Sequence, residues 1–170
     1  MCHCGANIGR IVNVPETVEY CKTLPNVVYA QEQLFSCATN CAKEITDMAK
    51  ENGLNRVIVA ACSPRTLDPL FRDTVREAGL NQYYYDMANI REHCSWVHSR
   101  EKEEATQKAK DIIRMSVART AHLEPLREID LPVTKAALVV GAGIAGMTCA
   151  LSVANQGHEV HLVEREKDLG

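Results

Sequence analysis

The sequence predicts an α/β protein in which a doubly wound parallel-sheet domain is followed by the first strand–helix–strand unit of a Rossmann-type nucleotide-binding domain. Three observations support this prediction. Strand and helix signals alternate over residues 1–122, a stretch with two prolines and no regular period covers residues 123–135, and a glycine motif lies between two apolar strands in residues 136–170. A complete Rossmann-type domain is much longer than this last segment, so we expect that domain to be truncated and the functional protein to be larger than this chain.

The helices of the first domain are predicted from apolar residues at three- and four-residue spacing between start and stop residues. They cover residues 15–22, 42–52, 67–78 and 103–122. Pro15 opens the first of them, and Gly53 and Gly79 close the second and the third.

Short apolar segments between these helices predict the strands of the sheet. They cover residues 26–30, 56–62 and 82–87. The second of these is apolar throughout after its first residue, which is typical of the buried centre of a parallel sheet. An alternating fold needs one more strand before the first helix, so either residues 1–4 form it or native residues are missing upstream; we favour a trimmed N-terminus.

The glycine motif begins in residues 137–147, where an apolar strand runs into a three-glycine turn and a helix of small residues. Gly141 is expected to make the turn, Gly143 to let the backbone approach a pyrophosphate, and Gly146 to let the helix pack on the strand. The anion would rest on the helix N-terminus. The alternative is a tight turn without a nucleotide, but the flanking strand and helix both favour the nucleotide site.

Glu164 lies eighteen residues past Gly146, at the end of the second apolar strand. This is where a carboxylate is expected to bind a ribose hydroxyl. Because a carboxylate repels a 2′-phosphate, Glu164 favours FAD or NAD over NADP, and FAD is our prediction.

Composition and charge argue against several classes of protein. A hydrophobic fraction of 46% is that of a globular protein, and the net charge of −3 comes from interspersed acidic and basic residues that leave no basic stripe for nucleic acid. No apolar run reaches the roughly 20 residues that span a membrane, and no signal peptide opens the chain. We therefore predict a cytoplasmic protein with no nucleic-acid partner and no membrane span.

The eight cysteines are several times the usual number for such a chain. Without a secretory signal they favour metal or redox chemistry over structural disulfides, and the absence of a Cys-x-x-Cys pair argues against a zinc ribbon or a thioredoxin-like motif. Cys4, Cys37, Cys62 and Cys94 each follow a predicted strand, and ligands of a parallel sheet gather at the carboxyl ends of its strands. Convergent thiolates from separate loops suit an iron-sulfur cluster.

Two more cysteines are candidate ligands, Cys2 beside Cys4 and Cys41 at the opening of a helix. The full set of candidate metal ligands is Cys2, Cys4, Cys37, Cys41, Cys62 and Cys94. Cys21 and Cys149 lie within helix patterns and are expected to act as small apolar residues instead.

Two other functions fit the same residues. One is a flavoprotein thiol/disulfide oxidoreductase without a cluster, with Cys37 and Cys41 as its redox pair. The other is a zinc-stabilised assembly module with cysteine or mixed cysteine and histidine ligation. The histidines near the cysteine loops are expected to be solvated more often than ligating; they are His3, His93 and His98.

Four segments, in order along the chain, resemble the A-type subunit of heterodisulfide reductase. They are Cys-His-Cys-Gly at residues 2–5, Ala-Cys-Ser-Pro-Arg at residues 61–65, Ala-Asn-Ile-Arg-Glu-His-Cys-Ser-Trp-Val-His at residues 88–98, and the stretch through the glycine motif at residues 133–146. The resemblance covers essentially all of the chain and indicates the N-terminal part of such a protein. In that family an iron-sulfur domain precedes an FAD domain similar to thioredoxin reductase.

The resemblance implies an electron-transfer subunit of an oxidoreductase that acts on sulfur groups, with a 4Fe-4S cluster and FAD for flavin-based electron bifurcation. It implies work with B and C type subunits and with hydrogenase or formate dehydrogenase subunits. No catalytic acid or base follows from it.

The resemblance also implies roles for individual residues. Cysteines from residues 2–4, with Cys37 and Cys62, would hold the cluster; position 41 departs from the family pattern and position 94 varies in it, so the fourth ligand stays open. The residues implied to contact FAD are Gly141, Gly143, Gly146 and Glu164. Residues 63–65 and Arg91 would either raise the cluster potential through hydrogen bonds and positive charge or be ordinary loop and surface residues.

Overall fold

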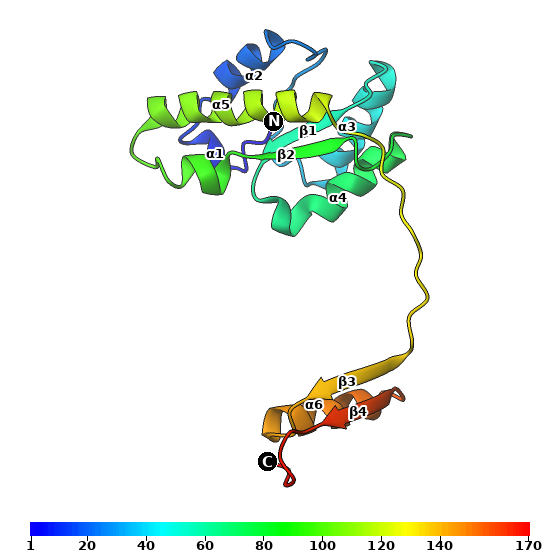
Figure 1. The fold of residues 1–170 in the computed structure, drawn as a ribbon. Helices are drawn as coiled ribbons and strands as arrows, with labels where there is room; N and C mark the ends of the chain where they lie inside the picture. Colours follow the sequence, from blue (N-terminus) through cyan, green and yellow to red (C-terminus); the bar gives the residue numbers. More distant parts are fainter. The chain divides into compact units, whose positions relative to one another are not determined.

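The computed structural model of the chain describes residues 1–170, and these form two compact units, Met1–Arg127 and Glu128–Gly170 (Figure 1). Each unit contains its own two-stranded parallel sheet. Residues 123–134 form neither helix nor strand.

The first unit alternates helices with strands. Its elements are α1 (Ala6–Gly9), α2 (Val14–Lys22), α3 (Thr39–Glu51), β1 (Val57–Ala61), α4 (Pro64–Glu77), β2 (Tyr85–Asn89), the π-helical turn η1 (Arg91–Ser95) and α5 (Lys102–Ala121). Side chains fix where two of the helices begin. Asn13 caps α2 by accepting the N–H of Glu16 at 3.2 Å, and Ser63 caps α4 by accepting the N–H of Arg65 at 3.3 Å.

Strands β1 and β2 pair in parallel, from Val57 opposite Tyr85 to Ala61 opposite Asn89. On the other edge of β1, the N–H of Cys2 donates to the carbonyl of Ala60 at 2.9 Å. Cys2 in turn makes an isolated parallel bridge with Gln33. The N-terminal residues therefore lie along the sheet, with Cys2 next to the carboxyl end of β1.

Side chains of β1 alternate between two apolar clusters, one on each face of the sheet. Ala60 belongs to a cluster with residues of α2 and α5, whereas Val59 and Ala61 pack with Phe71 and Val75 of α4. Figure 1 shows α2 and α5 on the opposite side of the strands from α4. Helices thus cover both faces, as the predicted doubly wound fold requires.

All four predicted helices of this unit are confirmed, with ends shifted by no more than three residues. The strand predicted over residues 26–30 is wrong, because these residues pair with no other strand. A cavity of about 630 Å³ is lined both by residues 26–31 and by residues 56–60, so the segment lies across a gap from β1 and has no ladder to join. Of the strand considered as one alternative at residues 1–4, only the bridge at Cys2 is present, and β2 begins three residues later than predicted.

The second unit is a strand–helix–strand unit, as predicted. Its elements are β3 (Ala136–Val140), α6 (Ile144–Ala154) and β4 (Glu159–Val163). The two strands are parallel, from Ala136 opposite Glu159 to Val140 opposite Val163. Its large apolar side chains remain exposed, among them Leu138, Val140, Ile144 and Leu151.

Candidate functional site

Cysteine thiols from three separate segments gather at the carboxyl end of β1. Cys2 and Cys4 precede α1, Cys37 and Cys41 flank the start of α3, and Cys62 directly follows β1. Partial burial raises the pKa of the Cys37 thiol, and the neighbouring thiols of Cys2, Cys4 and Cys41 raise it further. Besides burial, the thiol of Cys4 also raises the pKa of the Cys62 thiol, so five of the six candidate ligands lie close together.

Cys2 is buried, and its sulfur lies among backbone polar groups. Sγ accepts the N–H of Cys4 at 3.2 Å and the N–H of Ser36 at 3.4 Å, and it lies 3.8 Å from the carbonyl oxygen of Leu34. Amide N–H groups directed at a sulfur stabilise its thiolate form, as in iron-sulfur sites. The contact with Ser36 also ties the loop that carries Cys37 to the N-terminal segment.

Cys4 has a left-handed backbone, with φ of 47°, and Gly5 follows with φ of 55°. A side chain at Gly5 would place its Cβ 3.2 Å from the ring of Phe35. The sharp turn after the Cys-His-Cys segment therefore depends on a glycine at this position. It leaves Cys4 only half-buried, with its sulfur accepting a hydrogen bond from Nη1 of Arg91 at 3.3 Å.

Cys62 and Cys41 complete the group. Burial raises the pKa of the Cys62 thiol, while the guanidinium of Arg91 acts in the opposite direction. Cys41 lies in the first turn of α3, and its carbonyl accepts from the side-chain amide of Gln33 at 3.0 Å. Gln33 thus connects the bridge at Cys2 to the start of the helix that carries Cys41.

Cys94 lies apart from this group. It is fully buried in the apolar cluster that includes α5, and its Sγ donates to the carbonyl of Ala105 at 2.8 Å. Burial raises the pKa of the Cys94 thiol to about 11. Although Cys94 follows β2 in sequence, η1 turns it into the core. Cys21 packs in the same cluster, and Cys149 is exposed on α6.

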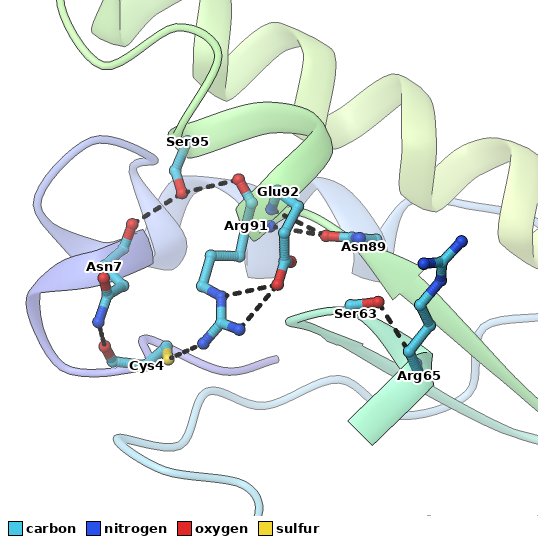
Figure 2. A network of polar contacts seen from close by, with 8 residues as sticks. All are labelled: Cys4, Asn7, Ser63, Arg65, Asn89, Arg91, Glu92 and Ser95. Atoms are coloured by element: carbon cyan, nitrogen blue, oxygen red, sulfur yellow. Dashed lines mark hydrogen bonds and ion pairs between the residues drawn. The ribbon is translucent and has the colours of Figure 1, made fainter. Parts of the chain in front are cut away.

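A polar network holds Arg91 beside Cys4 (Figure 2). Oε1 of Glu92 accepts from Nη2 of Arg91 at 2.7 Å and from Nε at 3.2 Å. Burial acts to raise the pKa of Glu92, but the hydrogen bonds from Arg91 and from backbone amides outweigh it and lower that pKa. Oδ1 of Asn89 accepts the backbone N–H groups of both residues, at 3.2 Å and 3.0 Å.

The cysteine sulfurs are not spaced as ligands of a single tetrahedral ion. One group of three histidine, cysteine or acidic residues has ligand atoms within 4.8 Å of one another, and it consists of His98, Glu101 and Glu104. No three cysteine sulfurs are that close. In the histidine group, Nε2 of His98 lies 3.3 Å from the ammonium of Lys108, which disfavours a cation there. His3 pairs with Glu32 at 2.9 Å, and His93 is exposed.

The glycine motif of the second unit has the geometry of a nucleotide-binding turn. Gly141 follows β3 with φ of 99°, and Gly143 is the N-cap of α6. A Cβ at Gly146 would lie 1.8 Å from the carbonyl oxygen of Gly141, so α6 approaches β3 as closely as glycine allows. At Gly143 a Cβ would meet nothing within 4 Å, which leaves the helix N-terminus open to an anion.

Glu164 follows β4 and reaches back to the glycine turn. Its Oε2 accepts the N–H of Ala142 at 2.7 Å, and Oε1 accepts those of Arg165 and Glu166 at 2.6 Å and 3.0 Å. These amides lower the pKa of the Glu164 carboxyl. The structure therefore brings the glycine turn and the acidic residue together.

Comparison with known proteins matches both units. Residues 139–170 match the model of an NAD(P)-binding Rossmann-like domain. A protein of Archaeoglobus profundus that is named for its likeness to the heterodisulfide reductase A-type subunit is 49% identical over 170 residues, which are 100% of this chain and 24% of that protein. The second of two iron-sulfur A-type subunits of the CoB--CoM heterodisulfide reductase of Methanopyrus kandleri is 50% identical over 100% of this chain and 26% of its own length. Over its full length the chain is similar to heterodisulfide reductase A-type subunits.

A third relative is the A-type subunit of the H(2):CoB-CoM heterodisulfide,ferredoxin reductase of Methanothermobacter marburgensis. It is 48% identical over 99% of this chain and 26% of its own length. The chain therefore spans about a quarter of the length of these relatives. The resemblance of the four segments to this family is confirmed.

Sequence reasoning missed several polar residues around the thiols of this chain. The backbone N–H of Ser36 donates to Sγ of Cys2, and the side-chain amide of Gln33 donates to the carbonyl of Cys41. In neither pair are the two residues neighbours in the sequence. Asn89 and Glu92 act by fixing Arg91. The proximity of Asn89 and Glu92 to Arg91 in sequence was a usable signal, whereas the contact of Ser36 with Cys2 depends on the fold.

No helix in this chain has both the length and the apolar character needed to cross a membrane.

Proposed function

We propose that this chain supplies a 4Fe-4S cluster site and the first FAD-contacting segment to an electron-transfer subunit of a heterodisulfide reductase-type complex. The observation that carries the proposal is the gathering of five thiols from three segments at the carboxyl end of β1. Similarity to heterodisulfide reductase A-type subunits, one of which carries the words iron-sulfur subunit in its name, supports the same function.

The donor set fits a cluster better than the alternatives. A cluster takes four thiolates, and four of Cys2, Cys4, Cys37, Cys41 and Cys62 can supply them. A single zinc ion with bonds of about 2.3 Å would bring its sulfur ligands to within about 4 Å of one another, whereas no three of these sulfurs lie within 4.8 Å. The amides at Cys2 and the guanidinium at Cys4 supply the N–H groups that cluster sulfurs accept.

The second unit supports the FAD part of the proposal. Gly143 and the start of α6 offer free N–H groups to a pyrophosphate, and Glu164 stands where a ribose hydroxyl would donate to it. We assign FAD contacts to Gly141, Gly143, Gly146 and Glu164. The exposed apolar side chains of this unit need further protein around them before the unit can enclose a cofactor.

When bound, a cluster passes single electrons and FAD takes up an electron pair, which together are the chemistry of flavin-based electron bifurcation. The residues of this chain would hold the cofactors and tune them.

The names of relatives suggest the partners. One belongs to an H(2):CoB-CoM heterodisulfide,ferredoxin reductase, and another, from Methanosarcina acetivorans, belongs to a Ferredoxin/F(420)H(2)-dependent CoB-CoM heterodisulfide reductase. By extension we propose that this chain acts in the cytoplasm as part of an oxidoreductase acting on sulfur groups. Its partners would be B and C type subunits and hydrogenase or formate dehydrogenase subunits.

The test is the content of iron and acid-labile sulfide per chain, with an absorption spectrum, in protein purified without oxygen. We expect about four of each and broad visible absorption. Stoichiometric zinc in a colourless protein would support an assembly module instead. A titratable disulfide between Cys37 and Cys41 without metal would support the thiol/disulfide oxidoreductase.

A further inference from the structure

Arg91 contacts a sulfur of the cysteine group directly. Its Nη1 donates to Sγ of Cys4 at 3.3 Å, although the two residues are 87 positions apart in the chain. Arg91 begins η1, which follows the carboxyl end of β2, and Cys4 lies in the N-terminal segment that runs along the other edge of β1. The contact is therefore set by the sheet and not by local sequence.

The guanidinium is held in this orientation from several sides. Oε1 of Glu92 accepts hydrogen bonds from Nε and Nη2 of Arg91, so Nη1 is the nitrogen directed at the sulfur (Figure 2). The carbon at the centre of the guanidinium lies 4.9 Å from the ring centroid of Trp96, a cation–π contact. Ser95 fixes the turn by donating to the carbonyls of Asn7 at 2.7 Å and of Arg91 at 3.3 Å.

The charge of Arg91 is largely balanced by that of Glu92. The two form an ion pair at 2.7 Å, with about a quarter of each side chain exposed. What distinguishes Arg91 from an ordinary surface cation is thus the directed N–H group at the sulfur. A hydrogen bond to a ligand sulfur stabilises the more negatively charged, reduced form of a cluster.

We infer that Arg91 raises the reduction potential of the cluster by donating a hydrogen bond to the thiolate of Cys4. The inference rests on the proposed function and deepens it, because it names the residue that tunes the cluster and selects Cys4 as a ligand. Arg91 touches the ligand and not the iron, so it is a tuning residue. Glu92 and Asn89 are the residues that position it.

Arg65 is the natural control. It follows Cys62 by three residues and is also a cation, but no hydrogen bond or ion pair joins its side chain to a thiol. Its backbone N–H donates to Ser63, and Figure 2 shows its side chain directed away from Cys4. If net charge near the cluster sets the reduction potential, replacing either arginine should lower it. If the N–H to sulfur contact sets the potential, only replacement of Arg91 should lower it.

The test is a redox titration followed by electron paramagnetic resonance on protein purified without oxygen, with iron and sulfide measured in every variant. For R91Q we expect a midpoint at least ~59 mV more negative, which is a tenfold change in the one-electron equilibrium constant. R91K keeps the charge but not the planar fork, so its midpoint should lie nearer to that of R91Q than to that of the unchanged protein. R65Q should change the midpoint potential by no more than about a third of the change seen in R91Q.

A midpoint unchanged in R91Q with four irons retained would overturn the inference and leave the proposed function standing. An equal fall in R65Q would also overturn it, since charge alone would then explain the effect. If R91Q loses its iron, R91K decides: a lowered midpoint supports the inference and an unchanged one refutes it. Absence of iron from the unchanged protein would refute both the inference and the proposed function.

Discussion

The two candidate sites of this chain are built in opposite ways. The glycine turn and Glu164 lie within one strand–helix–strand unit, so each residue of that site is placed by neighbours in sequence. The cysteine site joins segments around residues 4, 37, 62 and 91, which meet only when the whole first unit has folded. The first kind of site is fixed by a local motif and the second by the packing of a domain.

The two units also differ in how well they are covered. In the first, helices pack on both faces of the sheet, and Cys2 and Cys62 belong to one of its two buried apolar clusters. In the second, Leu138, Val140 and Ile144 are all more than 60% exposed. The unit with the local motif therefore buries less of its own apolar surface than the first unit does. Variants that separate the two sites test this comparison.

The largest expected effect is the loss of the cluster when one remote thiol is removed. Cys62 stands at the end of β1 and shares the site with Cys4. We expect C62S to reduce iron from about four to less than one per chain, because a cluster that lacks one of four thiolates is held poorly. The measurement is iron and sulfide content after purification without oxygen.

C149S is the matched control for C62S, since Cys149 is exposed on α6 in the other unit. It should keep its full iron content. Iron retained in C62S would remove Cys62 from the ligand set and leave the other four thiols.

The second prediction concerns the glycine turn and needs two variants of the same loop, studied in a full-length protein that carries these residues. G146A would place a methyl group 1.8 Å from the carbonyl oxygen of Gly141 and force α6 away from β3. We expect FAD affinity to fall at least a hundredfold. G143A adds a methyl group into open space at a φ of −67°, so the unit should fold while FAD binds about tenfold more weakly, equivalent to ~1.4 kcal/mol.

Flavin fluorescence titration gives the affinity, and circular dichroism checks the fold of both variants. Equal affinities in G146A and the unchanged protein would mean that the close approach of helix and strand is not needed. Neither variant should change iron content if the two sites are independent.

How much of each site the sequence could predict follows from this difference. The glycine turn and its contact with Glu164 could be predicted because turn geometry, close packing and acid spacing all act within one short stretch, whereas the nucleotide-binding roles of these residues stay a prediction. For the first unit, the rule that ligands follow parallel strands predicted a gathering of cysteines, but it also included Cys94. The rule locates the end of a strand; it does not say that η1 turns the next residues inward.

The missing strand at residues 26–30 has a similar cause. Its apolar residues fit a strand by composition, but pairing needs a neighbour at ladder distance, and a cavity separates the segment from β1. Likewise, nothing local marks Ser36 as a support of the site. Its role arises from a contact with Cys2 that only the folded unit makes.

The third prediction uses Cys94 to separate core cysteines from site cysteines. Its pKa of about 11 in the folded chain exceeds the value of about 8.5 in an unfolded chain, so the folded state holds the proton more tightly. The resulting stabilisation is complete below about pH 8.5 and is lost as the pH rises towards 11. At about 1.4 kcal/mol per pKa unit, roughly 2 kcal/mol of the free energy of unfolding should be lost by about pH 10.

Urea unfolding under reducing conditions at about pH 8 and about pH 10 measures this loss in the unchanged chain and in C94A. Burial also raises the pKa of Cys21 and Cys62, so both chains should lose stability with pH. The loss should be smaller in C94A. Identical losses would show that Cys94 does not titrate differently in the core.

The smallest expected effect is that of Glu164, the one residue of the second site that is not a glycine. Its carboxylate accepts N–H groups through both oxygens, from Ala142 at 2.7 Å and from Arg165 and Glu166 on the other side. In E164Q one oxygen becomes an NH₂ group, so either the glycine turn or the following residues must face a donor instead of an acceptor. A ribose hydroxyl would lose a charged acceptor as well. We expect FAD to bind about tenfold more weakly in a full-length protein, equivalent to ~1.4 kcal/mol.

E159Q is the control for E164Q, because Glu159 is exposed at the start of the same strand and pairs with His161 at 3.2 Å, away from the glycine turn. It should bind FAD as the unchanged protein does. If E164Q binds FAD with full affinity, the acid serves only to hold the turn, and the nucleotide would be recognised by backbone groups alone. That result would make the second site still more local than the comparison supposes, since three glycines and one helix N-terminus would then suffice for it.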